Sequence, residues 1–434
     1  MIFSLDVIRA RKGDCLMLHY GSKDNPHLIM IDGGPKRVYA DFLKPRIDQI
    51  RKARTLTNKQ PLQVDLLMVS HVDDDHIQGI LDLTREMLAR DMEHKPQLIQ
   101  VLDFWHNSFE NIIGQTPQEL TAMFTDQFGA ASMEGEPPDD LTVDRDDECE
   151  EVIGSTLKVL ASIKQGAQLA SDANRLEFPL NSDFGGNLVL AEGPNTIPLE
   201  DGPIFTVIGP MLPELKALHE KHQKWLEELA EQGKTAEDAL AAYVDKSVPN
   251  LSSIVSLAEL GGKSILLTGD ARGDKILEGL ELVERMEKGG KLHVDILKVP
   301  HHGSSNNLAP DFFERIIANH YVFSGNGEHG NPERESLEML LKARGDDDYE
   351  VHLTYPVNQI DAAREADWQK QQNKQKKKKE KNLQKKVRPP WSAEIHSLES
   401  FLKENENFAE KVRIVIADEP HLINLLEELT LTSD

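Results

Sequence analysis

The sequence predicts an α/β fold for a chain of 434 residues, because short apolar strands alternate with amphipathic helices. The first third contains strand-like runs at 3–8, 15–20 and 28–31, which turn-forming residues separate. Motifs rich in His and Asp follow the ends of several such runs. Because strands of one sandwich can end at a common edge, we expect these motifs to lie close together.

The alternation continues on both sides of a less regular middle segment. Further strands are expected at 64–70, 98–104, 204–208, 253–260, 264–268, 294–299, 321–324 and 349–355. Helices are expected at 39–52, 77–91, 118–124, 151–163, 213–231, 274–288, 309–318 and 332–342. The predicted organisation is a main domain over 1–358 with an insertion at about 105–203, a Lys-rich helix over 359–390 and a small helix–strand–helix extension over 391–434.

Composition favours a globular cytoplasmic protein with no membrane partner. Apolar residues make up 39% of the chain, and no apolar run is long enough to span a bilayer. The first residues are typical of a strand and lack the features of a signal peptide. The two cysteines, Cys15 and Cys149, offer no disulfide framework.

Charge is distributed unevenly along a chain whose net charge is −25. That net charge argues against simple non-specific attraction to nucleic acid. The stretch 134–151 is strongly acidic and 370–388 is strongly basic. Two interpretations of the basic stretch carry equal weight. One is a contact with a phosphate backbone; the other is either a solvated helix or a strap along the protein's own acidic surface, such as 134–151. The acidic loop or the C-terminal extension is a candidate docking surface for a protein partner. The lysines assigned to possible nucleic-acid binding are Lys376, Lys377, Lys378 and Lys379.

Four motifs place His or Asp after an apolar run. They are Asp32-Gly33-Gly34, the stretch 71–76, Thr268-Gly269-Asp270 and the stretch 300–304. The second motif puts two imidazoles and three carboxylates within six residues. A single His or Asp at a strand end is commonly a turn residue, but four such sites in this order favour a metal site.

This set resembles the metallo-β-lactamase superfamily, whose fold is a four-layer αββα sandwich with a metal site at one edge. The family motif His-x-His-x-Asp-His corresponds here to His71-x-Asp73-x-Asp75-His76. With Gly13-Asp14-Cys15 and the stretch 297–304, the chain is most similar to the hydrolase domain of bacterial DNA-uptake (competence) channel proteins. The resemblance covers about residues 1–104 and 204–342, and it implies that sandwich. It does not cover the mid-chain insertion or the C-terminal α/β extension, which complete the expected fold.

The resemblance implies a divalent-metal centre with one or two ions. One position would be complete, with Asp75, His76, His302 and a shared Asp270 as ligands. We align His302 with the family ligand, and His301 remains an alternative or a supporting residue.

The other position would hold its ion with His71, Asp73 and the shared Asp270. It lacks one imidazole, since Gly209 stands where the family usually has a His at the end of a central strand. This loss and the Asp at position 73 shift the site towards oxygen ligands, which suit Mn²⁺ or Mg²⁺ better than Zn²⁺. The centre is therefore expected to hold Zn²⁺ or Mn²⁺, with Mg²⁺ as a further option. Asp73 or Asp75 is expected to orient the attacking water.

Several other residues are candidates for supporting the ligands or contacting substrate. Asp32 is either a tight-turn residue or a support of the metal loop. Ser304 either bonds substrate or caps the next helix, and capping is favoured. His329 is a candidate substrate contact, although it is displaced from the position of the His-Pro pair of the DNA-uptake hydrolases. The full set is Asp32, His301, Lys298, Ser304 and His329.

The function favoured by these motifs is a metal-dependent hydrolase, most readily a phosphodiesterase or nuclease with nucleic acid as substrate. Hydrolysis of a small ester, lactone or amide on the same fold is an alternative, because one fold hosts many chemistries. A third hypothesis is a non-catalytic subunit of a larger complex, with a degenerate centre. A partner-regulated nuclease in bacterial defence fits the predicted architecture.

Overall fold

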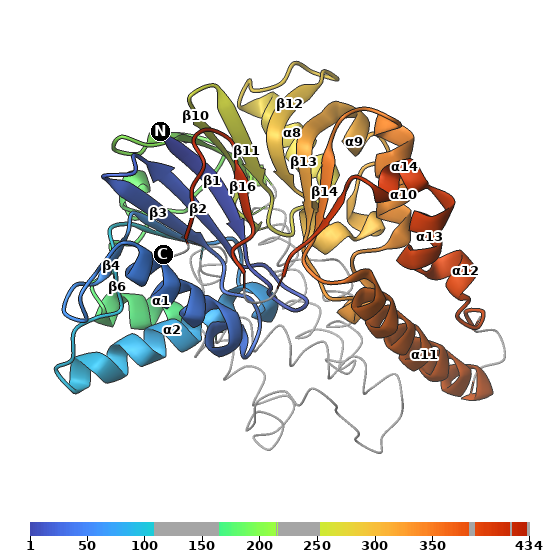
Figure 1. Cartoon of the computed structure of the whole chain (residues 1–434), viewed down its shortest axis with the longest axis horizontal. Helices are drawn as coiled ribbons and strands as arrows, with labels where there is room; N and C mark the ends of the chain where they lie inside the picture. The colour runs from blue at the N-terminus through green and yellow to red at the C-terminus, as the bar shows by residue number, and fades with distance from the viewer. Residues whose placement is uncertain (108–164, 214, 216–251, 382–386, 417–418, 432–434) are drawn as a thin grey trace, which may run out of the picture.

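The computed structural model of the chain describes residues 1–107, 165–213, 215, 252–381, 387–416 and 419–431. Over these residues the structure is a mixed α/β protein, as the sequence predicted, and it contains two large sheets. Figure 1 shows the two sheets side by side, with helices on their outer sides. Among the described residues, no helix is long and apolar enough to cross a membrane.

The first sheet has six strands in the order β16-β1-β2-β3-β5-β7. Its N-terminal strands are antiparallel to one another, whereas β3, β5 and β7 run parallel. The strands are β1 (Ile2–Val7), β2 (Leu16–Gly21), β3 (Pro26–Ile31), β5 (Leu66–Val69), β7 (Phe104–His106) and β16 (Leu422–Asn424). A small parallel pair, β4 (Leu62–Val64) and β6 (Ile99–Val101), forms a separate two-stranded sheet.

The second sheet has eight strands in the order β15-β14-β13-β12-β11-β10-β9-β8. The strands from β11 to β15 are parallel, while β8 to β11 are antiparallel. They are β8 (Thr196–Pro198), β9 (Ile204–Gly209), β10 (Val255–Leu260), β11 (Lys263–Leu267), β12 (Leu292–Lys298), β13 (Ile316–Phe323), β14 (Glu350–Leu353) and β15 (Val412–Ile414).

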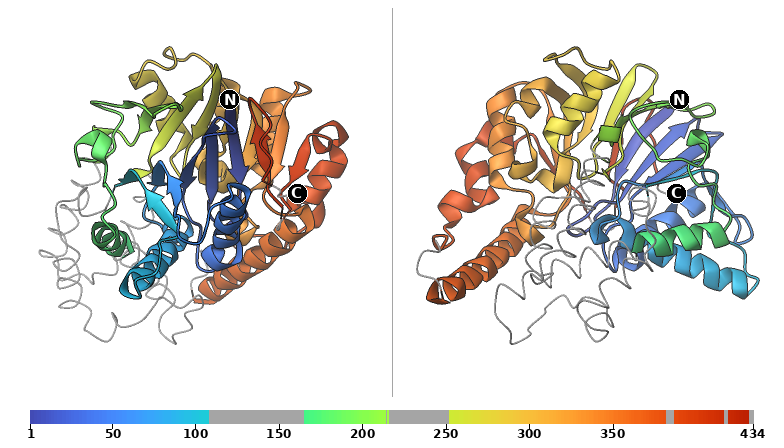
Figure 2. Two further views of the ribbon diagram at one scale, coloured as in Figure 1. Left: turned by 60° about the vertical axis from the view of Figure 1, so that its left-hand side comes forward. Right: turned by 180° about the vertical axis from the view of Figure 1, so that it is seen from behind.

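Three apolar clusters account for the packing. One joins alternate residues of both sheets, such as Leu5 and Leu18 of the first with Val207 and Ile296 of the second, so the sheets face each other. A second covers the other face of the first sheet with α1 (Lys44–Ala53) and α2 (Asp74–Met92). Figure 2 shows these helices and the sheets from two further sides.

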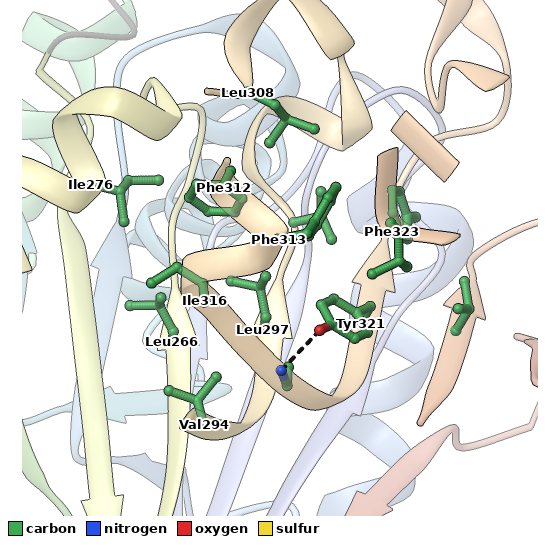
Figure 3. Packing of buried hydrophobic residues seen from close by; sticks show 14 of the residues in the cluster. Leu266, Ile276, Val294, Leu297, Leu308, Phe312, Phe313, Ile316, Tyr321 and Phe323 are labelled. Atoms are coloured by element: carbon green, nitrogen blue, oxygen red, sulfur yellow. Dashed lines mark hydrogen bonds between the residues drawn. The ribbon is translucent and has the colours of Figure 1, made fainter. Parts of the chain in front are cut away.

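The third cluster covers the outer face of the second sheet. Its helices are α8 (Gly273–Leu282), α9 (Phe312–Arg315), α10 (Arg334–Arg344) and α13 (Leu398–Glu404). Figure 3 shows Phe312, Phe313, Leu297 and Tyr321 within this cluster. The backbone N–H of Ala318 donates a hydrogen bond of 2.9 Å to the Tyr321 hydroxyl. This dense packing fixes the strands whose ends carry the polar motifs.

The remaining helices are short, with one exception. They are η1 (Tyr39–Leu43), η3 (Ser182–Phe184), α12 (Ala393–His396) and α14 (Glu406–Ala409). The exception is α11 (Val357–Lys381), which projects away from the sheets at the lower right of Figure 1. It corresponds to the predicted Lys-rich helix.

Several described elements differ from the sequence prediction. The helix expected at 274–288 ends at Leu282, and the strand expected at 98–104 is two strands, β6 and β7, in different sheets. The helix expected at 309–318 is a single turn, α9, because Ile316 and Ile317 already pair with β12 in the parallel sheet. The last element of the C-terminal extension is strand β16 rather than a helix, since it finds an antiparallel partner in β1. The helices expected at 118–124, 151–163 and most of 213–231 fall outside the described residues.

The segments interpreted as an insertion and an extension both contribute to the sheets. The edge strands β7 and β8 lie at the two ends of the stretch 105–203, and a helix over 165–175 packs on the first sheet through Leu169 and Ala173. Strands β15 and β16 of the C-terminal extension each extend one of the two sheets. The division into domains stays a prediction.

Candidate metal centre

The motifs that the sequence singled out follow the carboxyl ends of four strands. Asp32 follows β3, and the loop 70–73 connects β5 to α2. Asp270 lies three residues beyond Leu267, the last residue of β11, and η5 (Pro300–Gly303) follows β12. The two facing sheets bring these ends together.

Asp270 lies at the centre of the resulting cluster, and its two carboxylate oxygens face different imidazoles. Its Oδ1 is 3.2 Å from His76 Nε2 and 3.4 Å from His302 Nε2. Its Oδ2 is 3.8 Å from His71 Nε2 and 3.7 Å from His301 Nε2. One carboxylate thus separates two pairs of imidazole nitrogens.

Four polar atoms that point into this space are buried without a hydrogen-bond partner among the described residues. They are the Nε2 atoms of His71, His76 and His302 and the Oδ1 of Asp270. A buried polar atom without a partner is costly, and a group of them aimed at one place calls for a ligand. Imidazole nitrogen and carboxylate oxygen are the donors that divalent metals use. The residues present therefore fit a metal ion.

Asp73 and Asp75 line the more exposed side of the cluster. Asp73 Oδ2 is 3.8 Å from His71 Nε2. Asp75 lies near both other imidazoles, with Oδ1 4.0 Å from His76 Nε2 and Oδ2 3.8 Å from His302 Nε2. Their side chains are 30% and 23% exposed, whereas the imidazoles of His71 and His76 are fully buried. Solvent therefore reaches the centre along the carboxylates.

Asp14 is a buried member of the cluster that sequence reasoning left out of the site. Asp14, His76, Asp270 and His302 form a buried group that could coordinate a divalent metal. Asp14, however, faces the Nδ1 side of the imidazoles, at 3.3 Å from His302 Nδ1 and 3.9 Å from His76 Nδ1. The signal that could have found it was the Gly13-Asp14-Cys15 stretch, which contributed to the resemblance only.

Both oxygens of Asp14 have partners of their own. Oδ1 accepts a hydrogen bond from the Ser324 hydroxyl, and Oδ2 lies 2.6 Å from Lys298 Nζ. Ser324 Oγ is in turn 3.0 Å from His302 Nδ1. Asp14 therefore orients the ring of His302, and the ring presents Nε2 to Asp270.

Asp32 performs the same task for His76. Its Oδ2 is 2.8 Å from His76 Nδ1 and accepts a hydrogen bond of 2.7 Å from the Ser70 hydroxyl. Its Oδ1 accepts a hydrogen bond of 2.7 Å from the Ser70 backbone N–H. A carboxylate behind a ligating imidazole fixes its tautomer and raises its basicity.

The other candidates for substrate contact or support have separate placements. Lys298 is buried on Asp14 and donates to the Val299 carbonyl at 3.0 Å, so it faces inward. Ser304 occupies the N-cap position of η6 (Ser305–Asn307) but makes no side-chain capping bond, which makes the capping prediction wrong. His329, in η7 (Glu328–Gly330), has Nε2 3.5 Å from Lys12 Nζ.

The backbone of the centre is held in unusual conformations. Asp32, His301 and His302 have φ angles of 56°, 47° and 54°, in the left-handed region that residues other than glycine seldom adopt. Such strain concentrates at functional sites. Gly13 is required by a close approach, since a Cβ there would lie 1.8 Å from the carbonyl oxygen of Asp75. The loop around Gly13 thereby packs directly on the metal loop.

The charges of the centre favour a cation. Burial alone would raise the pKa of Asp270, but the imidazoles of His302 and His76 hold it well below its usual value. Burial would lower the pKa of His302, yet the Asp270 and Asp14 carboxylates raise it to about 9. Burial and the neighbouring His76 lower the pKa of His71 to about 3. The Asp270 and Asp14 carboxylates thus favour a positive charge beside them. A proton on His302 provides that charge, and a bound divalent ion would provide it as well.

Gly209 ends β9 opposite Val255, and β9 lies next to the edge strand β8 of the second sheet. The nearest atom to a Cβ built there would be Val255 Cγ2 at 3.5 Å, an ordinary contact. A side chain is thus sterically allowed at this position, and the missing imidazole is not explained by crowding at the β-carbon.

The predicted nucleic-acid lysines lie near the end of α11. Lys376, Lys377 and Lys379 are exposed, and Lys376 Nζ donates to Gln372 Oε1 at 2.8 Å. The side chain of Lys378 lies outside the described residues, as does the acidic stretch 134–151. A contact between the basic helix and that acidic stretch stays a hypothesis.

Comparison with known proteins gives short matches. No protein-family profile matches the chain. Microtubule-associated protein 1A of Rattus norvegicus is 31% identical over 146 residues, which is 33% of this chain and 5% of that protein. Microtubule-associated protein futsch of Drosophila melanogaster is 38% identical over 76 residues, 16% of this chain and 1% of the relative.

A bacterial protein also matches. ComE operon protein 3 of Bacillus subtilis (strain 168) is 31% identical over 100 residues, which is 23% of this chain and 12% of that protein. The chain therefore spans a small fraction of the length of the curated relatives that it matches.

Proposed function

We propose that the chain is a metal-dependent hydrolase with the four-layer αββα sandwich of the metallo-β-lactamase superfamily, and that it acts in the cytoplasm on phosphodiester bonds. The observation that carries the proposal is the position of Asp270, whose two oxygens face separate pairs of imidazole Nε2 atoms. A carboxylate between two groups of nitrogen donors is suited to bridging two metal positions. The partial similarity to ComE operon protein 3 supports the same family.

The first proposed position takes its donors from His76, His302, Asp75 and Asp270. Both imidazoles are held from behind by carboxylates, through Asp32 Oδ2 at 2.8 Å from His76 Nδ1 and Asp14 Oδ1 at 3.3 Å from His302 Nδ1. This support leaves the Nε2 lone pairs directed at Asp270 Oδ1. We therefore expect the first position to bind more tightly than the second.

The second proposed position takes its donors from His71, Asp73 and the Oδ2 of Asp270. His301 adds a fourth donor to the set derived from sequence, because its Nε2 lies 3.7 Å from Asp270 Oδ2. This imidazole compensates in part for the one that Gly209 does not provide. With His301 included, each position has two imidazole and two carboxylate donors, a mixed set that suits Zn²⁺ or Mn²⁺, with Mg²⁺ as a further option.

The chemistry follows from this arrangement. A divalent ion bound at the centre supplies a Lewis acid and lowers the pKa of a water molecule. Asp73 and Asp75, at 30% and 23% exposure, lie where solvent reaches the centre. Either carboxylate can accept the proton of the attacking water, and the buried residues exclude further solvent.

The choice of a phosphodiester rests on two features. The carboxylate donors at both positions suit ions that also contact phosphoryl oxygens. The exposed lysines of α11 provide positive charge on a chain of net charge −25, and a polyanionic substrate is a natural partner for them. Both features are weaker arguments for a small neutral ester or lactone.

A second candidate function is a non-catalytic interaction module. It is favoured by the similarity to two microtubule-associated proteins over 33% and 16% of the chain. In that case the acidic stretch or the C-terminal extension would bind a protein partner, and the buried His and Asp residues would have a structural role.

The experiment that tests the proposal is hydrolysis by the full chain after metal removal and re-addition of Mn²⁺, Mg²⁺ or Zn²⁺. The substrates are plasmid DNA, RNA, a chromogenic phosphodiester and a chromogenic lactone. We expect metal-dependent cleavage of a phosphodiester that Asp75→Asn and His302→Ala abolish. His293→Ala is the matched control, since His293 is an exposed histidine near the start of β12, the strand that η5 follows.

The other outcomes separate the alternatives. Turnover of the lactone without any phosphodiester cleavage would assign a small-molecule hydrolase. Failure to bind any metal, together with no turnover, would overturn the hydrolase proposal and leave the interaction module. Full activity in His302→Ala would contradict the assignment of the centre.

A further inference from the structure

A second group of metal-type donors lies outside the candidate centre, on the parallel strands β13 and β14. It consists of His320 of β13 with Glu350 and His352 of β14. His320 lies four residues before Ser324, which contacts the first centre, and four strand residues span roughly 13 Å. The two groups are therefore separate places on the same sheet. Nothing in the proposed hydrolysis uses this second group.

The three donor atoms form a compact triangle. His320 Nδ1 is 3.2 Å from His352 Nε2 and 3.4 Å from Glu350 Oε2. The third side, from His352 Nε2 to Glu350 Oε2, is 3.7 Å. Tetrahedral Zn²⁺ at about 2.0–2.1 Å from each ligand requires ligand atoms roughly 3.3 Å apart. The triangle matches one face of such a tetrahedron.

Two further residues hold the donors from behind. His352 Nδ1 is 2.8 Å from His421 Nε2, and Glu350 Oε1 is 2.8 Å from Arg413 Nη2. When His352 donates its Nδ1–H to His421, its Nε2 carries the lone pair and points at the triangle. The Arg413 contact leaves Glu350 Oε2 as the carboxylate oxygen that faces the imidazoles.

We propose that His320 Nδ1, His352 Nε2 and Glu350 Oε2 bind one Zn²⁺-type ion, with water at the fourth position. Two imidazoles and one carboxylate are a ligand set that Zn²⁺ takes in proteins. The side chains of His320 and Glu350 are 25% and 34% exposed, so an ion can enter from solvent. His352 is nearly buried, at 4%.

The position of the group suggests what the ion would do. His421 belongs to the segment between β15 of one sheet and β16 of the other, and its carbonyl accepts a hydrogen bond of 3.0 Å from the backbone N–H of Val7. Fixing His352 against His421 would tie that segment to both sheets. The ion would thus stabilise the attachment of the C-terminal strands.

The test measures metal binding rather than activity, and uses Co²⁺ as the probe. The first centre is disabled by Asp270→Ala with His302→Ala in the full chain, and circular dichroism verifies the fold. We expect one Co²⁺ per chain to remain, with the visible absorption of a four-coordinate ion. Adding His320→Ala or Glu350→Gln should remove it, and His293→Ala should not.

His421→Ala is a further variant with a graded expectation. Because His421 orients His352 without contacting the ion, its loss should weaken Co²⁺ binding by about 10–100-fold rather than abolish it. If the disabled chain does not fold, the same comparison is made in the wild-type background, where His320→Ala with Glu350→Gln should reduce the bound Co²⁺ by one per chain.

Two results would overturn the proposal. One is the absence of any bound Co²⁺ in the folded chain that lacks the first centre, with no change of stoichiometry in the wild-type background. The close approach of the two imidazoles would then be explained by the hydrogen bond between His320 and His352, without an ion. The other is Co²⁺ that persists with unchanged absorption after His320→Ala and Glu350→Gln. Neither result bears on turnover at the first centre.

Discussion

Lys298 Nζ lies 2.6 Å from Asp14 Oδ2, and the two side chains are 1% and 2% exposed. The ion pair stands directly behind His302, whose Nδ1 is 3.3 Å from Asp14 Oδ1. Burial alone would raise the pKa of Asp14, but Lys298 and His302 hold it well below its usual value. Lys298 therefore acts on the centre through Asp14, as a positioning residue rather than a substrate contact.

Asp14→Asn should weaken both the fold and metal binding. The substitution leaves the buried Lys298 charge unpaired, and breaking a buried pair in this way costs about 3–5 kcal/mol of unfolding free energy. Loss of the carboxylate behind His302 should lower metal affinity by about 10–100-fold. Urea unfolding in the presence of a chelator measures the first effect, and metal titration of the folded variant measures the second.

The double variant Asp14→Asn with Lys298→Met provides the control for that prediction. It removes both charges, so its unfolding free energy should exceed that of Asp14→Asn alone. Its metal affinity should stay low, because His302 still lacks its support. A double variant that binds metal as tightly as the wild type would contradict the role given to Asp14.

Substitutions at Asp270 and Asp73 should differ in how many ions they remove. Asp270 faces both pairs of imidazoles, whereas Asp73 lies 3.8 Å from His71, a donor of the second proposed position. Asp270→Asn should therefore reduce binding at both proposed positions, and Asp73→Asn should reduce binding at the second only. Mn²⁺ titration followed by electron paramagnetic resonance counts the bound ions. Equal losses in the two variants would argue against a bridging Asp270.

The convergence of the motifs was predictable from sequence because it depends on local patterns. Apolar runs such as 64–70 end in polar residues, and strand ends in facing sheets meet at one edge. Asp32, His76, Asp270 and His302 were found in this way. Their mutual distances follow from two packed sheets, and the individual strands are indicated by periodicity that short windows of sequence contain.

The missed features depend on contacts between distant parts of the chain. Asp14 acquires its role from Ser324, which is 310 residues away in sequence. Strand β16 exists because β1 offers an edge, with Ser4 opposite Asn424. Strand β13 begins at Ile316, within the stretch expected to be a helix, because Ile316 pairs with Leu292. Such tertiary pairing overrides local propensity and leaves no signal in a short window.

Gly13→Ala should destabilise the metal loop. The added Cβ would lie 1.8 Å from the Asp75 carbonyl oxygen, so the two loops must separate. We expect a loss of about 1–3 kcal/mol in unfolding free energy and weaker metal binding, because Asp75 moves. Gly209→Ala is the matched control, since its Cβ meets Val255 at an ordinary 3.5 Å. Both are measured by urea unfolding and metal titration, and equal behaviour of the two variants would refute the argument.

His106 should make the stability of the chain depend on pH. It is buried, at 1% exposure, and burial lowers its pKa to about 4 from the ordinary 6.5. Between those values the unfolded chain binds a proton that the folded chain does not, so unfolding free energy falls as pH decreases from 6.5 to 4. The slope from this residue is at most about 1.4 kcal/mol per pH unit. His106→Leu should flatten the curve by that amount in urea unfolding with a chelator present, and parallel curves for the two proteins would show that His106 is not the group responsible.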